Sequence, residues 1–259
     1  RAARAAFLKH ELLNRKFSEV IEAVIDILAG RSAGLTISDL KRITNEAAVM
    51  AARRESKVTD AILEEAFEKM RMGEASKVPD PATLERVARH ESGHALIGWL
   101  TGHPPVQVTI VGRGSAGGYV EREAQEEKII YTRGDLEQII CQAMGGRAAE
   151  LIYYGDADGL STGVASDLRN ATMWAERMIS EFGMSEDIGQ AYVDERRLHD
   201  GPLAARVNEA TERIVRSQLD RAIEMLKASR GKLDGLSSEL LRKNRLVRAD
   251  LERLLGASG

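Results

Sequence analysis

The apolar positions of residues 1–75 recur every three or four residues, which is the period of one face of an α-helix. Two stretches of this pattern follow hydroxyl side chains that can cap a helix N-terminus: Thr36 or Ser38 precedes one, and Thr59 precedes the other. Gly30 ends an earlier stretch. The sequence therefore predicts consecutive short helices in this part of the chain.

A break in the pattern follows at residues 71–81, R-M-G-E-A-S-K-V-P-D-P. Its glycine and two prolines interrupt both helix and sheet, because proline lacks a backbone N–H donor and fixes φ. The domain boundary is placed in this segment. Residues 1–75 are predicted to be one domain, 76–81 a linker and 82–259 a second domain.

The second domain continues with helical patterns but contains one alternating segment. V-Q-V-T-I-V at 106–111 alternates and is β-branched, which predicts a strand, and Tyr119 and Val120 are predicted to begin a returning strand. The predicted fold class is mainly α, with a small helical domain followed by a largely helical domain that has a small β-sheet. The predicted helices of the second domain cover 82–102, 132–150, 166–182 and two or three segments within 203–255, and a loop is predicted at 155–166.

Composition supports this fold class and narrows the function. The 259 residues are 43% hydrophobic and only 4% aromatic, and Ala, Leu, Glu and Arg are abundant, a balance that favours helices over a sheet-rich sandwich. The formal net charge is -3. Because proteins that bind nucleic acid usually have a basic excess, no nucleic-acid partner is expected.

The single cysteine, the apolar runs and the first residues of the chain bear on the cellular compartment of the protein. Cys141 has no second cysteine to pair with, so an internal disulfide is impossible and a reducing compartment fits. No apolar run reaches the length of a membrane span, and no secretory signal opens the chain. Because the chain begins at Arg1 without Met, we interpret it as a processed or excised fragment. The fragment itself is expected to be soluble, and any membrane anchor could lie in the missing part.

The string H-E-S-G-H at residues 90–94 is the main chemical signal. On a helix, His90 and His94 lie on one face with Cβ atoms roughly 5–6 Å apart, so both imidazoles can bind one zinc ion. Glu91, beside the first histidine, can act as the general base that takes a proton from zinc-activated water. Gly93 and Ala95 are small and would let another element approach the metal. The alternative is two surface histidines and an ordinary glutamate.

A zinc peptidase needs a third protein ligand, and the spacing of the residues does not select it. Carboxylates that follow in the sequence are candidates, and each also has an ordinary explanation as a loop or helix-surface charge. A lone histidine is a weaker candidate. The carboxylate candidates are Glu150, Asp156, Asp158 and Asp167, and the histidines are His103 and His199.

Several separated segments resemble the FtsH family of AAA-type, ATP-dependent zinc proteases. H-E-S-G-H-A-L resembles the family's H-E-A-G-H-A zinc helix, with Ser92 in place of Ala, and V-T-I-V-G-R-G-S-A-G-G-Y resembles its V-T-I-x-x-R-G-x-A-L-G-x segment, with Gly117 in place of Leu. Residues 35–54 are similar to the helical lid of the family's AAA module. Further matches are G-G-R-A-A-E (145–150), L-S-T-G-V-A-S-D-L-R-N-A-T (160–172) and E-F-G-M-S (181–185).

The resemblance implies roles for individual residues. The family's metal-binding aspartate falls on Asp167, which makes His90, His94 and Asp167 the expected zinc ligands, and Glu150 is then expected to orient a ligand histidine. Residues 1–75 would be the AAA helical lid. The chain has no G-x-x-x-x-G-K-[ST] phosphate loop, so ATP and Mg²⁺ are expected only in an ATPase core that this sequence does not contain.

The resemblance also implies the function. The chain is expected to be the zinc-dependent endopeptidase part of an ATP-dependent protease, with one Zn²⁺ per chain and Glu91 as general base. The expected substrates are unfolded or membrane-derived polypeptides, in the service of protein quality control. The family further implies a homo-hexamer and an N-terminal membrane anchor in the full-length protein, with this part in the cytoplasm.

Two questions stay open at the level of sequence. Gly117–Val120 is a candidate edge strand that would hold substrate through main-chain hydrogen bonds, or simply a hairpin turn. Arg113 would face substrate or a neighbouring subunit, or be an ordinary solvated turn residue.

The main rival function is a non-catalytic helical interaction or assembly module of a AAA unfoldase. The intact His-Glu-His set argues against this rival, because a structural zinc site does not need Glu91.

Overall fold

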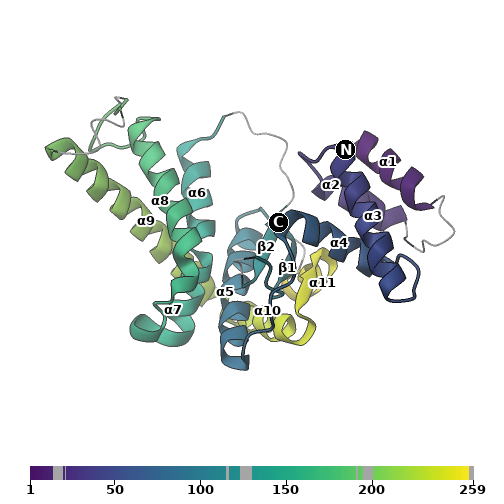
Figure 1. The fold of residues 1–259 in the computed structure, drawn as a ribbon. Helices are drawn as coiled ribbons and strands as arrows, with labels where there is room; N and C mark the ends of the chain where they lie inside the picture. Colours follow the sequence, from purple (N-terminus) through teal and green to yellow (C-terminus); the bar gives the residue numbers. More distant parts are fainter. Residues whose placement is uncertain are drawn as a thin grey trace. The chain divides into compact units, whose positions relative to one another are not determined.

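The computed structural model describes residues 1–13, 20, 22–114, 117–122, 130–190, 192–194 and 201–256 (Figure 1). The chain divides into two compact units. The first consists mainly of Arg1–Ser76 with a short piece that begins at Arg113, and the second mainly of Lys77–Gly112, Gly117–Arg122 and Lys128–Gly259. Helices dominate both units and one small sheet is present, so the predicted mainly α class is confirmed.

The first unit contains helices that bury one apolar cluster. Thr36 accepts a hydrogen bond from the Asp39 backbone and Asp39 bonds back to Thr36, a reciprocal capping box, and Thr59 caps the next helix. The two threonine caps that the sequence predicts are thus confirmed. The assignment of this unit as an AAA lid stays a prediction. Its helices are α1 (Ala2–Leu13), α2 (Glu22–Arg31), α3 (Ile37–Arg53) and α4 (Asp60–Met72).

Arg113 belongs to this first unit and is not a solvated turn residue. Its side chain is buried, it pairs with Glu68 at 3.1 Å, and it donates to the Gly73 carbonyl at 3.1 Å. A buried carboxylate is costly unless it is paired, so the Arg113–Glu68 bridge is structural. The interpretation of Arg113 as an ordinary solvated turn residue is therefore wrong.

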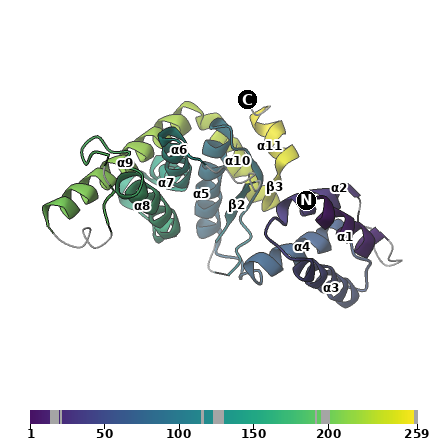
Figure 2. The ribbon, with the colours of Figure 1, turned by 90° about the horizontal axis from the view of Figure 1, so that it is seen from above.

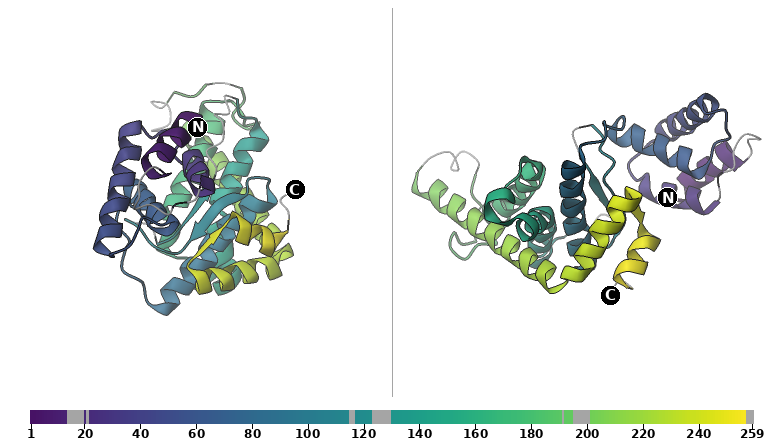
Figure 3. Two further views of the ribbon diagram at one scale, coloured as in Figure 1. Left: turned by 90° about the vertical axis from the view of Figure 1, so that its right-hand side faces the viewer. Right: turned by 90° about the horizontal axis from the view of Figure 1, so that it is seen from below.

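The long helix α5 (Pro81–Leu100) is the centre of the second unit. Asp80 caps its N-terminus by accepting from the Ala82 and Thr83 backbones, and Pro81 occupies the first turn, where its missing N–H is no loss. Its second half is buried all round. Figures 2 and 3 show why: helices α6–α9 lie on one side of α5, and the sheet with α10 and α11 lies on the other.

The helices beside α5 differ in two places from the prediction. The helix expected over 132–150 is divided at Met144 into α6 and α7, and the helix α7 continues past a kink at Gly155 into the expected loop. Gly155 has φ 73, which suits glycine. No helix among the described residues could span a membrane. The bounds are α6 (Arg133–Ala143), α7 (Gly145–Asp158), η1 (Thr162–Val164), α8 (Ala165–Ser180), α9 (Pro202–Ala228), α10 (Arg230–Lys243) and α11 (Arg248–Leu255).

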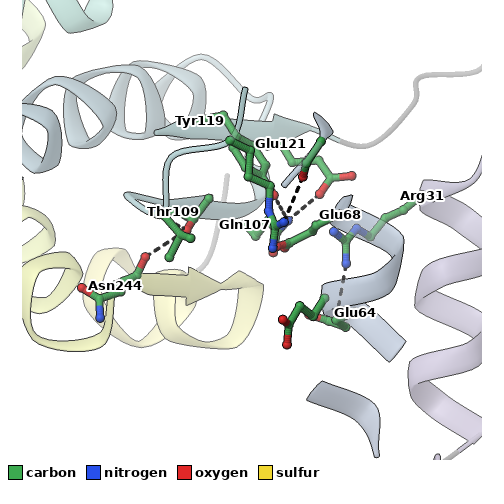
Figure 4. Close-up of polar contacts among 12 residues, drawn as sticks. Arg31, Glu64, Glu68, Gln107, Thr109, Tyr119, Glu121 and Asn244 are labelled. Carbon is green, nitrogen blue, oxygen red and sulfur yellow. Dashed lines mark hydrogen bonds and ion pairs between the residues drawn. The ribbon is translucent and has the colours of Figure 1, made fainter. Parts of the chain in front are cut away.

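The sheet is antiparallel and has the order β2-β1-β3 in the described part of the chain. Strands β1 (Pro105–Thr109) and β2 (Tyr119–Arg122) were predicted, whereas β3 (Arg245–Val247) was not. Asn244 ends α10 in the left-handed conformation, and its carbonyl accepts from the Thr109 hydroxyl at 3.0 Å (Figure 4). This contact fixes β3 against β1, and β2 is left at an edge of the sheet.

Candidate metal centre

Three side chains from two helices converge beside the buried half of α5. His90 and His94 are one turn apart on α5, and their Nε2 atoms are 3.1 Å from each other. Asp167 comes from the first turn of α8, and its Oδ2 lies 3.1 Å from His90 Nε2 and 3.2 Å from His94 Nε2. The expected trio thus forms a compact triangle of potential ligand atoms.

The other ring nitrogen of each histidine already has a partner. Nδ1 of His90 lies 2.7 Å from Glu150 Oε1, and Nδ1 of His94 lies 2.9 Å from the Gln142 carbonyl oxygen. Both partners accept hydrogen bonds, so each Nδ1 carries a proton, and each ring, when it is neutral, presents an Nε2 lone pair to the centre. In that neutral state two lone pairs and one carboxylate oxygen at this distance repel one another, and a cation between them removes the repulsion.

The donor set and its spacing fit zinc. Two imidazole nitrogens and one carboxylate oxygen are zinc ligands, and bonds of about 2.0–2.1 Å to a tetrahedral ion place ligand atoms about 3.3 Å apart. The observed separations of 3.1 to 3.2 Å come close to this value. Three protein ligands leave one coordination position for water or substrate, which is the pattern of a catalytic site rather than a structural one.

Glycines let α7 approach α5 closely at this point. A Cβ on Gly93 would lie 2.3 Å from the Gly145 carbonyl oxygen, and a Cβ on Gly146 would lie 2.4 Å from both Cε1 and Nε2 of His90. Any larger residue would therefore displace an imidazole or separate the two helices. The expectation that small residues on α5 admit a neighbouring element is confirmed at Gly93.

The pKa values of His90 and Asp167 are shifted in the directions that favour exchange of a proton for a metal cation. Burial alone would lower the pKa of His90, but the hydrogen bonds to Asp167 and Glu150 outweigh burial and raise this pKa to about 10. Burial raises the pKa of Asp167, yet its hydrogen bonds to the two histidines dominate and lower it. In the chain alone, a protonated His90 thus satisfies the two carboxylates.

We expect zinc binding to release the His90 proton and to strengthen as pH rises from 6 to 8, by up to about tenfold per pH unit. In the zinc-free chain, the raised His90 pKa stabilises the fold fully below the ordinary pKa of 6.5, and this contribution is lost as pH rises through about 10. Calorimetric zinc titrations in buffers of different ionisation enthalpy measure the number of protons released when zinc binds. An affinity independent of pH would contradict the exchange.

Glu91 is buried next to the first histidine, with 7% of its surface exposed. Burial raises its pKa, against the lowering influence of His94 and His90. A raised pKa brings a carboxylate closer to the working range of a general acid and base at neutral pH. The Gly118 backbone packs directly on Glu91, because a Cβ on Gly118 would lie 2.9 Å from Glu91 Cγ.

The remaining candidates for a third ligand lie elsewhere. Glu150 is buried but contacts the far nitrogen of His90, so it is not in the triangle. Asp156 and Asp158 are exposed on α7, and His103 bonds the Thr101 carbonyl. His199 lies outside the described residues. The hydrogen bond from His94 to the Gln142 carbonyl was not predicted from the sequence. No sequence signal could have indicated it, because every residue has a carbonyl.

Comparisons with known proteins agree with the geometry. The sequence model of peptidase family M41 matches residues 77–254. The chain is 35% identical over 242 residues to the mitochondrial inner membrane m-AAA protease component AFG3L1 of Mus musculus, covering 88% of this chain and 30% of that protein. It is 36% identical over 244 residues to the ATP-dependent zinc metalloprotease FtsH 2 of Symbiobacterium thermophilum, covering 89% of this chain and 40% of that protein.

A third relative matches more of the chain. The ATP-dependent zinc metalloprotease FtsH of Bacillus subtilis is 32% identical over 271 residues, which covers 97% of this chain and 42% of that protein. The chain thus spans between 30% and 42% of the length of these three relatives. More than half of each relative therefore lies outside the region that matches this chain.

Proposed function

Since this chain belongs to peptidase family M41, the family of the FtsH zinc metalloproteases, we propose that it hydrolyses peptide bonds at the centre formed by His90, His94 and Asp167, with Glu91 as general base. Family membership confirms two expectations from the sequence, the zinc metallopeptidase class and Zn²⁺ as cofactor. The observation that carries the proposal is the convergence of three acceptor atoms beside a buried glutamate.

Each residue has a separate task in this proposal. His90, His94 and Asp167 hold the ion, which when bound supplies Lewis-acid chemistry by lowering the pKa of water and polarising a carbonyl. Glu91 accepts the proton of the attacking water on its carboxylate and passes it to the leaving amine. Glu150 and the Gln142 carbonyl keep the imidazoles in the tautomer that can bind a metal.

Strand β2 is our candidate for substrate binding by strand addition. In the order β2-β1-β3 it lies at an edge, and its N-terminal neighbour Gly118 packs against Glu91. An extended peptide that adds to this edge would run past the general base, held by main-chain hydrogen bonds and with little side-chain preference. The simpler interpretation of Gly117–Val120 as a plain hairpin segment gives no reason for the contact with Glu91.

Methylating single backbone nitrogens of a cleavable peptide tests this binding mode. Alternate N–H groups of an added strand point toward the edge, so N-methylation should lower kcat/KM strongly at every second position and weakly between. The measurement is kcat/KM for a series of singly N-methylated peptides. Uniformly small effects, with cleavage retained throughout, would favour the hairpin interpretation.

The properties of the whole protein are part of the proposal. The relatives named above are ATP-dependent or belong to an inner-membrane protease. By that analogy, residues 1–75 would be the AAA helical lid, residues 76–81 the linker and residues 82–259 the peptidase domain. The parent would be a membrane-anchored homo-hexamer that feeds unfolded or membrane-derived polypeptides to this part in the cytoplasm, using ATP and Mg²⁺ bound by an ATPase core.

Zinc content and cleavage of an unfolded protein test the function together. We expect about one zinc per folded chain and cleavage of casein that stops when a chelator removes zinc and resumes when zinc is restored. Zinc binding without cleavage would mean that hydrolysis requires the ATPase core. A folded chain that binds no zinc would remove the proposal and favour the rival, a non-catalytic assembly module.

A further inference from the structure

We propose that Arg86 is a positioning residue for the zinc centre, acting on His90 through Glu150. This inference rests on the proposed function, because it assigns Arg86 a task at the same site. Arg86 lies on α5 one turn before His90, and the carboxylate of Glu150 on α7 bridges the two side chains. Arg86 touches none of the three candidate metal ligands in the contacts of the described chain.

The bridge consists of two short contacts to different oxygens of one carboxylate. Oε1 of Glu150 accepts from His90 Nδ1 at 2.7 Å, and Oε2 accepts from Arg86 Nη1 at 2.8 Å. A carboxylate held at both oxygens cannot rotate without breaking one bond. The plane of Glu150, and with it the direction in which the His90 lone pair points, is therefore set partly by Arg86.

The charge of Arg86 matters because Glu150 is buried. Only 1% of the Glu150 side chain is exposed, compared with 29% for Arg86. A buried carboxylate without a cationic partner is strongly unfavourable, and the Arg86 guanidinium lies 2.8 Å from Glu150 Oε2. Arg86 thus places a positive charge beside the carboxylate that contacts His90.

Stacking fixes the Arg86 guanidinium in place. Its central carbon lies 4.0 Å from the centroid of the Tyr154 ring, which is on α7 one turn beyond Glu150. Such cation–π contacts add to the attraction and hold the planar group in one orientation. The Glu150 carboxylate on α7 therefore connects two side chains of α5, one of which is held by the neighbouring Tyr154 ring.

Arg89 provides a matched control on the same helix. It stacks on the same aromatic pair, at 4.4 Å from the Tyr153 ring and 5.1 Å from the Tyr154 ring. Its ion pair, however, is with Glu85 at 2.5 Å, and it makes no bond to Glu150 among its contacts in the described chain. Removing either arginine removes stacking and charge from this surface, but only Arg86 is connected to the metal centre.

The test compares zinc affinity, measured by competition with a chromogenic chelator, in three variants of the complete chain. Arg86→Met should weaken zinc binding by about tenfold, the lower end of what loss of a residue behind a ligand costs. Arg89→Met should leave the affinity within about twofold. Arg86→Lys, which restores the charge without the planar fork, should recover part of the loss. Equal effects of Arg86→Met and Arg89→Met would overturn the proposal.

A double-mutant cycle separates positioning from general destabilisation. If Arg86 acts through Glu150, then Arg86→Met should change zinc affinity in the wild-type background but hardly at all in a Glu150→Gln background. If Arg86 had only a structural role, Arg86→Met would weaken zinc binding equally in the wild-type and Glu150→Gln backgrounds. That additive outcome would refute the inference. Wild-type protein is the reference: if it binds no zinc, the proposed function fails, whereas normal binding by wild type and by Arg86→Met refutes only the role of Arg86.

Discussion

Replacing Glu91 by Gln is expected to abolish detectable peptide-bond hydrolysis while leaving zinc bound. The amide keeps the size of the side chain but cannot accept the proton of an attacking water. Loss of a general acid and base costs about 10²–10⁴-fold in rate, and Glu91 is proposed to act in both proton transfers, so the upper end of this range is expected. Initial rates of casein cleavage measure the change, with zinc per chain determined on the same samples.

Glu85→Gln is the matched control for Glu91→Gln. Glu85 lies on the same helix, but its side chain is 46% exposed and pairs with Arg89 at the surface. The same chemical change there should leave both rate and zinc content nearly unaltered, because an exposed ion pair contributes little. Substantial cleavage by Glu91→Gln with zinc in place would show that another group moves the proton.

Asp167→Ala is expected to cause the largest loss of zinc of any single substitution of a carboxylate in the chain. The variant removes one of the three converging atoms that are proposed to bind zinc, and the only one of them that belongs to a carboxylate. Substitutions behind a metal ligand cost about 10–100-fold in affinity, so removing a ligand itself should cost more than about 100-fold. Metal analysis after dialysis, followed by competition with a chelator, measures the loss.

Comparing Glu150→Ala with Asp167→Ala shows which of the two carboxylates contributes more to zinc binding. Glu150 contacts His90 on the nitrogen that faces away from the triangle, so its removal should weaken zinc binding less than removal of Asp167 does. Thermal unfolding of the zinc-free variants controls for loss of folding, since both carboxylates also bond His90. The opposite ranking in folded proteins would exclude Asp167 as the third ligand and restore Glu150 as the candidate.

Local signals in the sequence determined most of the helices. Thr36 and Thr59 cap helices where the sequence predicted caps, with Thr36 rather than Ser38 at the first of them, because a capping side chain bonds backbone only two or three residues away. The shared face of His90 and His94 follows equally from one helical turn. These features depend on neighbours in sequence, so the sequence alone was sufficient for them.

The position of Asp167 was decided by tertiary structure. Residue spacing left four carboxylates open as third ligand, and only the packing of α8 beside α5 brings Asp167 to 3.1 Å from His90. The resemblance to a family had selected Asp167, but nothing in its local pattern distinguishes it from the exposed Asp156. The contact joins residues far apart in sequence, and no local periodicity encodes such a distance.

Strand β3 and the burial of Arg113 were also decided by contacts between residues far apart in the sequence. Residues 245–247 are too few to show an alternating pattern, and they form a strand because the Asn244 carbonyl and the strand β1 hold them there. Arg113 looks like a turn residue until Glu68 is placed beside it. Hydrogen bonds and ion pairs between distant segments exist only after the chain has folded. The sequence therefore determined most of the helices and the metal motif, and the tertiary structure decided which carboxylate lies beside the two histidines.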